Sequence, residues 1–267
     1  MDVVEGLARL HASHGRLFVV VGVFDGLHRG HAYLLRRLVA EAARRGARPA
    51  VITFDAHPDE ILTGSAPPLL IDPQERVTRL ARAGVAVTIV QHFDRALRET
   101  PYDAFVAMLT DRTELAGFLM TPDAAFGYQR GGTPESLAAL GATADPPWDV
   151  AVVPPFVIDG RPVRSTEIRE AIARGDLGGA ATLLGRAHAV VGDADGVREG
   201  MRLTFPMPVA LPPDGDYAVR VGSPLRDGSP SRGRSTVGTV EGATVRVSGA
   251  VRSDRVRVAF VGTAVGG

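Results

Sequence analysis

No cysteine, lysine or asparagine occurs in this sequence of 267 residues. Without cysteine the chain has no disulfide, no thiolate ligand for zinc and no thiol nucleophile. Without lysine it has neither a Schiff-base amine nor the lysine of a P-loop, and any asparagine-dependent site is excluded as well. All thirty basic residues are therefore arginines, and cationic side-chain contacts to phosphate fall to arginine.

Charge and hydropathy set further limits on function. Thirty acidic residues balance the thirty arginines, so bulk charge does not favour nucleic acid or anionic lipid. The longest useful apolar run, residues 17–24, is far too short to span a bilayer, and the N-terminus lacks the pattern of a signal peptide. We therefore expect a cytoplasmic protein that acts on small molecules, with no nucleic-acid or membrane partner; a homo-oligomer is left open.

Between residues 17 and 185, apolar runs alternate with amphipathic segments. This alternation predicts βαβ units and an α/β fold, a parallel, doubly wound Rossmann-like sheet over residues 1–185, with ligands beyond the carboxyl ends of its strands. Strands are expected at 17–21, 50–54, 87–91, 117–121 and 149–153, and helices at 31–45, 73–84, 101–112, 134–140, 166–174 and 177–184.

The pattern changes after Arg186, where no long helical period remains. Short β-rich segments separated by Pro- and Gly-rich turns predict a small antiparallel, barrel-like β domain over residues 186–267. Residues 222–238 are rich in Ser, Gly, Pro and Arg and are expected to form a mobile loop. Strands are expected at 188–191, 202–205, 217–221, 243–247 and 255–261.

The strongest chemical signal is the segment GVFDGLHRGH, which follows the first strand and opens the first helix. The free N–H groups of a helix start form an anion site, and Gly22, Gly26 and Gly30 allow the backbone to approach a polyanion. His28 and His31 lie three residues apart and can donate hydrogen bonds to charge that develops in phosphoryl transfer. The glycine spacing fits no dinucleotide fingerprint, and a Walker loop needs lysine.

Ser165 and Thr166 stand at the predicted start of another helix, and Arg169 follows one turn later. A helix start with hydroxyl side chains binds anions, and a guanidinium can hold a phosphate with paired N–H bonds. The structural alternative is a capped helix with a solvated arginine. Beside the first motif, we interpret these three residues as phosphate ligands.

Three further residues lie where a ligand or a turn is expected. His57 and the following Pro58 come after a predicted strand, and their alternative interpretation is a simple turn. Asp123 offers a carboxylate to magnesium or to a ribose hydroxyl, with a structural turn as the alternative. Asp25 is interpreted chiefly as the residue that organises the phosphate loop, and ligand contact is its second interpretation.

These motifs resemble the bacterial bifunctional riboflavin kinase/FAD synthetases, a family of the HxGH nucleotidyltransferase superfamily. The resemblance covers about residues 16–222 in order. It is carried by GVFDGLHRGH at 22–31, TFDAHP at 53–58, DAAFGYQRG at 123–131, RSTEIR at 164–169 and LLGR at 183–186.

The resemblance implies an FMN adenylyltransferase, which joins FMN to the AMP of Mg²⁺-bound ATP and releases pyrophosphate. Magnesium is expected mainly on the substrate phosphates, and its protein ligands are unknown. By resemblance the catalytic residues are His28, His31, Ser165, Thr166 and Arg169; the ATP-binding residues are Gly22, Phe24, Asp25, Gly26 and Gly30; and the flavin-binding residues are His57, Pro58, Asp123, Phe126 and Arg130.

The C-terminal part departs from the family pattern. The kinase module of the family carries a Pro-Thr-Ala-Asn run, whereas the matching stretch here is Phe205-Pro-Met-Pro-Val209. Pro206 is kept, but threonine and asparagine are not. We therefore expect riboflavin kinase activity to be lost and residues 186–267 to be a truncated, degenerate domain that serves as a packing partner, a flavin-binding remnant or an oligomer contact.

Two alternatives stand beside the FMN adenylyltransferase. One is a nucleotidyltransferase of the same fold with a different phosphorylated acceptor and CTP as another donor. It stays open because the loop 124–130 has alanine where the family usually has an aromatic residue. The other is a non-catalytic flavin- or nucleotide-binding protein. The intact first and last motifs argue against it, because a binding protein has no need of two phosphate-binding ends.

Overall fold

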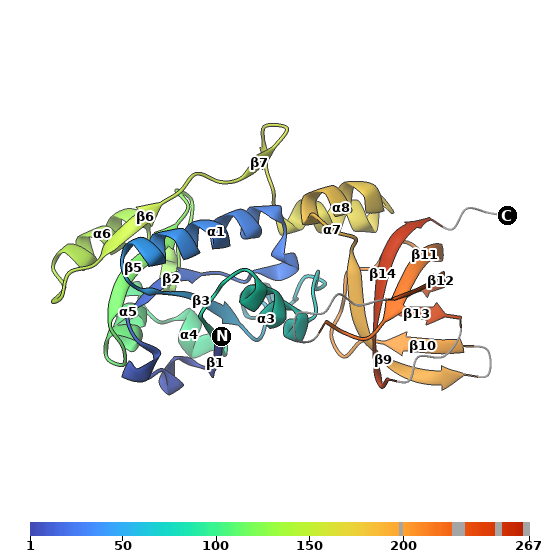
Figure 1. Ribbon diagram of the computed structural model, residues 1–267, viewed down its shortest axis with the longest axis horizontal. Coiled ribbons are helices and arrows are strands. Elements are labelled where there is room, and N and C mark those ends of the chain that lie inside the picture. Colours follow the sequence, from blue (N-terminus) through green and yellow to red (C-terminus); the bar gives the residue numbers. More distant parts are fainter. Residues whose placement is uncertain (198–199, 226–232, 249–252, 264–267) are drawn as a thin grey trace. The chain divides into compact units, whose positions relative to one another are not determined.

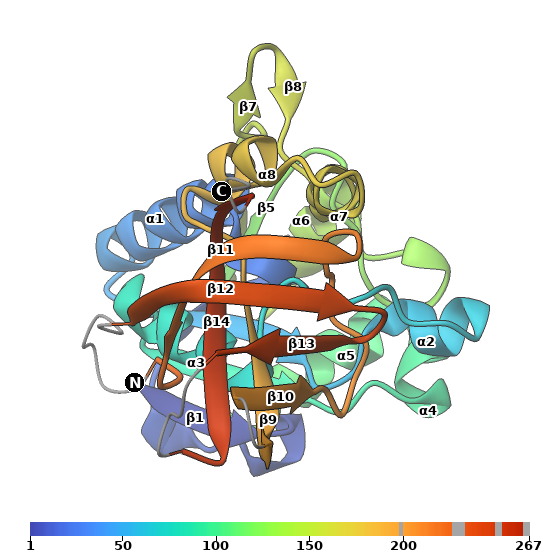
Figure 2. The ribbon, with the colours of Figure 1, turned by 90° about the vertical axis from the view of Figure 1, so that its right-hand side faces the viewer.

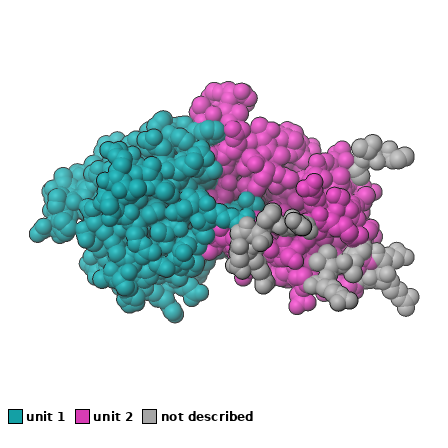
Figure 3. All heavy atoms as spheres, in the orientation of Figure 1, with its two compact units in different colours: residues 1–24, 30–66, 79–156 teal, residues 25–29, 67–78, 157–267 magenta. Residues whose placement is uncertain are grey.

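The computed structural model describes residues 1–197, 200–225, 233–248 and 253–263 (Figure 1). The chain forms two compact units, coloured separately in Figure 3. Unit 1 comprises Met1–Phe24, Gly30–Ala66 and Arg79–Phe156, and unit 2 comprises Asp25–Arg29, Pro67–Thr78 and Val157–Gly267. The boundary at residue 185 stays a prediction, and the segment 25–29 of the first motif groups with unit 2.

Unit 1 is built on a parallel sheet of six strands in the order β1-β4-β3-β2-β5-β6. The predicted parallel α/β architecture is confirmed. The sequence did not predict the short edge strand β1, which pairs with β4. The strands are β1 (Asp2–Glu5), β2 (Leu17–Val21), β3 (Arg48–Phe54), β4 (Val87–Gln91), β5 (Leu115–Met120) and β6 (Asp149–Val152).

The sheet is covered on both faces. Leu17 and Val19 of β2 belong to one buried cluster together with Phe105 of α5, whereas Phe18 points to the opposite face, beside Arg45. This alternation follows from the two-residue period of a strand. The helices before residue 157 are η1 (Leu7–Arg9), η2 (Ala12–His14), η3 (Asp25–Leu27), α1 (Arg29–Arg44), α2 (Pro58–Thr63), α3 (Pro73–Arg82), α4 (Arg95–Arg98), α5 (Tyr102–Thr110), η4 (Tyr128–Arg130) and α6 (Pro134–Ala142).

Unit 2 contains a closed antiparallel barrel of six strands in the order β10-β13-β12-β11-β14-β9 (Figure 2). Its interior is filled by aliphatic and aromatic side chains such as Leu203, Val245 and Phe260. The elements are the hairpin β7 (Val157–Ile158) and β8 (Arg161–Pro162), α7 (Ser165–Ala173), α8 (Leu177–Leu184), β9 (Ala189–Val197), β10 (Gly200–Thr204), β11 (Gly215–Gly222), β12 (Arg234–Glu241), β13 (Thr244–Val247) and β14 (Arg255–Thr263).

The predicted loop over residues 222–238 is wrong at its C-terminal end. Residues 234–238 belong to β12, which pairs with both β11 and β13. Composition favoured a loop, but Gly238 suits a close approach, since a Cβ there would lie 3.0 Å from Val219. Residues 226–232 of the predicted loop lie outside the described residues.

The helices in the described part of the chain all lack the combination of length and apolar character that a membrane crossing requires.

Arg45, which directly follows α1, forms hydrogen bonds that connect this helix to β6 of the sheet. Its Nε and Nη2 donate to the Asp149 carboxylate at 3.0 and 2.8 Å, and its Nη1 donates to Glu41 at 2.5 Å. The guanidinium also lies 4.3 Å from the centre of the Phe18 ring. These contacts raise the pKa of Arg45 above its usual range, chiefly through the Asp149 hydrogen bond. They use the forked geometry that lysine lacks.

We predict that Arg45→Ala lowers the free energy of unfolding by about 3 kcal/mol, because it leaves the buried Glu41 carboxylate short of a partner. Arg44→Ala is the matched control. Arg44 also bonds Glu41, but its side chain is 75% exposed, so its loss should cost less than about 1 kcal/mol. Urea unfolding measures both variants, and equal losses would contradict the anchoring role of Arg45.

Candidate active site

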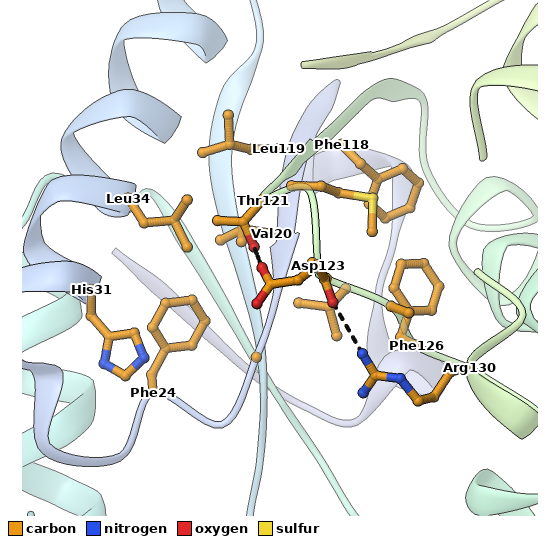
Figure 4. Close-up of a pocket in the computed structure, with 15 residues that line it drawn as sticks. Val20, Phe24, His31, Leu34, Phe118, Leu119, Thr121, Asp123, Phe126 and Arg130 are labelled. Atoms are coloured by element: carbon orange, nitrogen blue, oxygen red, sulfur yellow. Dashed lines mark hydrogen bonds between the residues drawn. The ribbon is translucent and has the colours of Figure 1, made fainter. Parts of the chain in front are cut away.

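The order of the strands defines where a ligand is expected. β3 and β4 follow β2 in the chain and lie on one side of it in the strand order. The chain then crosses over, and β5 lies on the opposite side of β2. The carboxyl ends of two such strands diverge and leave a crevice, which is where open α/β sheets bind ligands. In this structure a cavity of about 320 Å³ lies at that point, lined by residues at the ends of β2 and β5 (Figure 4).

One wall of the cavity comes from the first motif. Gly22, Phe24 and His31 line it, and the rings of Phe24 and His31 lie 5.0 Å apart. Phe24 is 2% exposed and has φ 53°, a left-handed conformation that costs free energy for a residue with a side chain. Thr53 helps to hold it by donating a hydrogen bond to the carbonyl of Val23 at 3.0 Å.

Glycine at position 22 leaves space for the side chain of Phe24. A Cβ there would lie 3.1 Å from the folded-back ring of Phe24. The glycine therefore makes room for the aromatic ring that forms this wall.

The opposite wall comes from the loop after β5. Asp123, Phe126 and Arg130 line it, and Arg130 Nη2 donates to the carbonyl of Asp123 at 3.0 Å (Figure 4). The Asp123 carboxylate accepts the hydroxyl of Thr121 at 2.8 Å. Phe126 packs 5.6 Å from Phe118 of β5. Three of the five predicted flavin-side residues thus share a cavity with three residues of the first motif.

His57 and Pro58 are placed differently. They do not line this cavity, and they form the start of α2, where His57 Nδ1 accepts the N–H of Asp59 at 3.2 Å. His57 is therefore the N-cap of a short helix rather than part of a simple turn, and flavin binding by His57 and Pro58 stays a prediction.

In unit 2, Asp25 is the centre of a buried hydrogen-bond network. It is 2% exposed, and its carboxylate accepts the N–H of Leu70 at 3.0 Å and Nη2 of Arg169 at 2.5 Å. Its carbonyl accepts the hydroxyl of Ser165 at 3.0 Å. Arg169 Nε also donates to the carbonyl of Pro68 at 2.8 Å. Ser165 and Arg169, which the sequence assigned to ATP phosphates, are therefore bonded to Asp25 of the first motif, and Arg169 is also bonded to Pro68.

Thr166 occupies the first turn of α7, next to Ser165, and its side chain is exposed. The N-cap residue is Arg164, which makes no side-chain capping bond. The predicted helix start is present. Its N–H groups are of the kind that bind anions, and phosphate binding there stays a prediction.

Arg186 donates to the carbonyls of Gly26 and Leu27 at 2.5 and 3.2 Å. No role for this residue was predicted from the sequence. Its place in the LLGR segment was the one available signal, because a contact over 160 residues of sequence leaves no local pattern. Arg186 and Arg169 together hold the loop from two elements.

His28 is 4% exposed, and its pKa is lowered to about 4, mainly by burial and then by the nearby Arg186 guanidinium. Its imidazole is therefore neutral at physiological pH and donates one N–H rather than acting as a cation.

We predict that the histidines titrate far apart. His28 and His188, which is 1% exposed, have pKa values lowered to about 4, whereas the Asp55 carboxylate raises the pKa of His92. At pH 5.5, NMR of isotope-labelled histidine should show His92 protonated and the other two neutral. A midpoint near pH 6.5 for His28 would contradict the structure.

The lowered pKa values of His28 and His188 should also make the free energy of unfolding depend on pH. Between pH 6.5 and about 4, the unfolded chain binds protons at His28 and His188 that the folded chain does not. The free energy of unfolding should therefore fall as the pH drops through this window, by about 2 kcal/mol per histidine at pH 5.

The family model for FAD synthetase matches residues 10–167. A bifunctional riboflavin kinase/FMN adenylyltransferase of Haemophilus influenzae is 31% identical over 230 residues, which cover 83% of this chain and 74% of that protein. The protein of the same name in Escherichia coli K12 is 30% identical over 230 residues, 83% of this chain and 73% of that protein.

A crystal structure described as a macrolide-efflux protein from Streptococcus pneumoniae aligns with a TM-score of 0.79 over 98% of this chain and 89% of that one. At 22% identity this likeness shows the fold alone. The resemblance stated from the motifs is confirmed by the family model and the sequence relatives, and the chain belongs to the FAD synthetase family of nucleotidyltransferases.

Proposed function

We propose that this protein is an FMN adenylyltransferase, which transfers AMP from Mg²⁺-bound ATP to FMN and gives FAD and pyrophosphate. The family and the names of the relatives support this activity. The observation that carries the proposal is the cavity between β2 and β5, because residues of the phosphate motif and residues of the predicted flavin-side loop line it together.

The walls of the cavity suit a flat aromatic acceptor. Phe24, Phe118 and Phe126 supply apolar surface, while Asp123 and Arg130 supply polar groups. Small ligands bind in such sites through apolar contact, and a few placed polar groups set their orientation. Ala124 and Ala125 also line the cavity and leave room beside the aromatic side chains.

The reaction proposed is a direct in-line displacement. A phosphate oxygen of FMN attacks the α-phosphorus of ATP, the new P–O–P bond forms, and the bond to the β-phosphate oxygen breaks with its electron pair leaving on pyrophosphate. No proton has to move in this step, so positioning and stabilisation of charge carry the catalysis.

His28 and His31 have complementary places in this mechanism. His31 lies in the first turn of α1 and lines the cavity, and the buried, neutral His28 precedes that helix. In the proposal both donate N–H bonds to ATP phosphate oxygens, where they stabilise the charge that develops on the phosphates.

The start of α7 is assigned to the β- and γ-phosphates in this proposal. Thr166 offers a hydroxyl beside the N–H groups of the helix start. Ser165 and Arg169 hold the loop through Asp25, so in the proposal they act on the phosphates by fixing the position of that loop.

Magnesium enters with the substrate. The described residues contain no group of three or more His, Asp or Glu side chains arranged to hold a metal ion. Mg²⁺ prefers substrate phosphates and water to an all-protein cage, and we therefore propose that the phosphates of ATP hold it.

Riboflavin kinase activity is proposed to be absent. The sequence lacks the threonine and asparagine of the kinase motif at residues 205–209. Part of that stretch is engaged by backbone pairing, because Val209 forms a parallel bridge with Leu69, whose N–H donates to the carbonyl of Pro208 at 2.9 Å.

We predict that the purified protein with magnesium, ATP and FMN forms FAD and pyrophosphate in equal amounts, and that CTP does not replace ATP. Chromatography of the flavins and a pyrophosphate assay measure both products. Riboflavin with ATP should give no FMN, and FMN formation would overturn the proposed loss of the kinase.

Failure to form FAD from ATP and FMN would contradict the proposal. Pyrophosphate release with a different phosphorylated acceptor would instead support the second function, a nucleotidyltransferase of the same fold.

We predict that His31→Ala and His28→Ala each lower kcat by about 10²–10³-fold, the usual cost of removing one donor to developing charge. His11→Ala is the matched control, because His11 is exposed and does not line the cavity. Circular dichroism should show that the fold is kept. Losses smaller than about tenfold in both variants would remove these histidines from the mechanism.

A further inference from the structure

Arg186 lies just beyond the end of α8, outside the range 10–167 that the family model matches. Gly185 ends the helix in a left-handed conformation with φ 72°, and its N–H donates to the carbonyl of Ala181 at 2.8 Å. The N–H of Arg186 reaches the same carbonyl at 3.2 Å. These two hydrogen bonds fix the backbone at the end of α8, so that the chain turns away from the helix axis at Arg186.

The guanidinium of Arg186 caps the short η3 turn of the phosphate loop. Nη2 donates to the carbonyl of Gly26 at 2.5 Å, and Nη1 donates to the carbonyls of Leu27 and Leu184 at 3.2 and 3.3 Å. The carbonyls at the end of a helical turn need partners from outside that turn. A single arginine therefore joins the end of α8 to the loop that precedes His28.

One of the two residues whose carbonyls Arg186 binds has a strained backbone conformation. Gly26 has φ 79° and Leu27 has φ 40°, and the second is strained for a residue with a Cβ. Position 26 is closely packed, since a Cβ there would lie 3.1 Å from Leu70 and 3.4 Å from Leu184.

We propose that Arg186 is a positioning residue for nucleotidyl transfer, which holds the backbone of residues 26 and 27 so that His28 and the start of α1 are presented to the triphosphate of the substrate. This inference rests on the proposed function. It extends the catalytic apparatus to the segment LLGR at 183–186, which lies outside the residues 10–167 that the family model matches.

Charge supports the same assignment. The positive charge of Arg186 is the second cause, after burial, of the lowered pKa of His28. A lysine at this position would keep the charge but not the fork that reaches two successive carbonyls.

The test compares Arg186→Ala, Arg186→Lys and Arg112→Ala in the full chain. Arg112 is the matched control, because it follows α5 by two residues and donates to the carbonyl of Met108 at 3.2 Å, as Arg186 does at α8. Arg186→Ala should lower kcat by about 10–100-fold, the typical cost of losing a supporting contact around a site. The KM for FMN should stay unchanged, and Arg112→Ala should keep full activity.

Chemical rescue separates positioning from a purely structural role. Guanidinium at about 20 mM, far below the molar range that unfolds proteins, should restore part of the activity of Arg186→Ala, and methylammonium should not. If Arg186→Ala does not fold, Arg186→Lys replaces it and should show an intermediate loss of kcat. Full activity of Arg186→Ala, or a loss that guanidinium does not restore, would overturn the assignment.

A binding measurement keeps this proposal distinct from the proposed function. If the unaltered protein makes no FAD, the proposed function fails, yet calorimetry with magnesium tripolyphosphate still tests Arg186. Arg186→Ala should then bind tripolyphosphate at least about tenfold more weakly, a change of 1.4 kcal/mol. Equal affinities would contradict the positioning role even if FAD synthesis were established.

Discussion

The ion pair between Asp25 and Arg169 is the interaction on which the phosphate loop depends. A carboxylate that is 2% exposed is stable only when its oxygens are fully paired, and here the N–H of Leu70 and the guanidinium supply the partners. Through this one group, the loop, the segment 68–70 and helix α7 are fixed together. A change in any one of the three would leave a buried charge short of partners.

An arginine-only set of cations suits this design. Arg45 bonds two carboxylates and stacks on a ring, Arg169 bonds a carboxylate and a carbonyl, and Arg186 bonds successive carbonyls. Each contact set uses several N–H groups of one planar fork, whereas an ammonium group offers a single point of charge. The absence of lysine is therefore accompanied by arginines that connect elements far apart in the sequence.

Local patterns predicted the sheet, because β2 is a continuous apolar run and β4 is rich in β-branched residues. The start of α3 was equally readable, since the Asp72 carboxylate accepts the N–H groups of Gln74 and Glu75. Two residues that the motifs singled out, His31 and Asp123, line one cavity in unit 1. A contact over 160 residues leaves no local signal, which is why the contacts of Arg186 were not predicted. The start of β12 was missed for another reason, because its Ser-, Gly- and Arg-rich composition favoured a loop. Ser165, Arg169 and Asp25 could thus be named from the sequence, whereas the partners that they bond could not.

In the proposed reaction, AMP passes from ATP to FMN in one direct displacement, without a covalent enzyme intermediate. The stereochemical course at phosphorus tests it most directly, with FMN and a single diastereomer of ATP that carries sulfur on the α-phosphorus. One in-line displacement inverts the configuration, so the FAD analogue formed should have inverted phosphorus. Retention would show two successive displacements through a covalent enzyme intermediate and would contradict the claim.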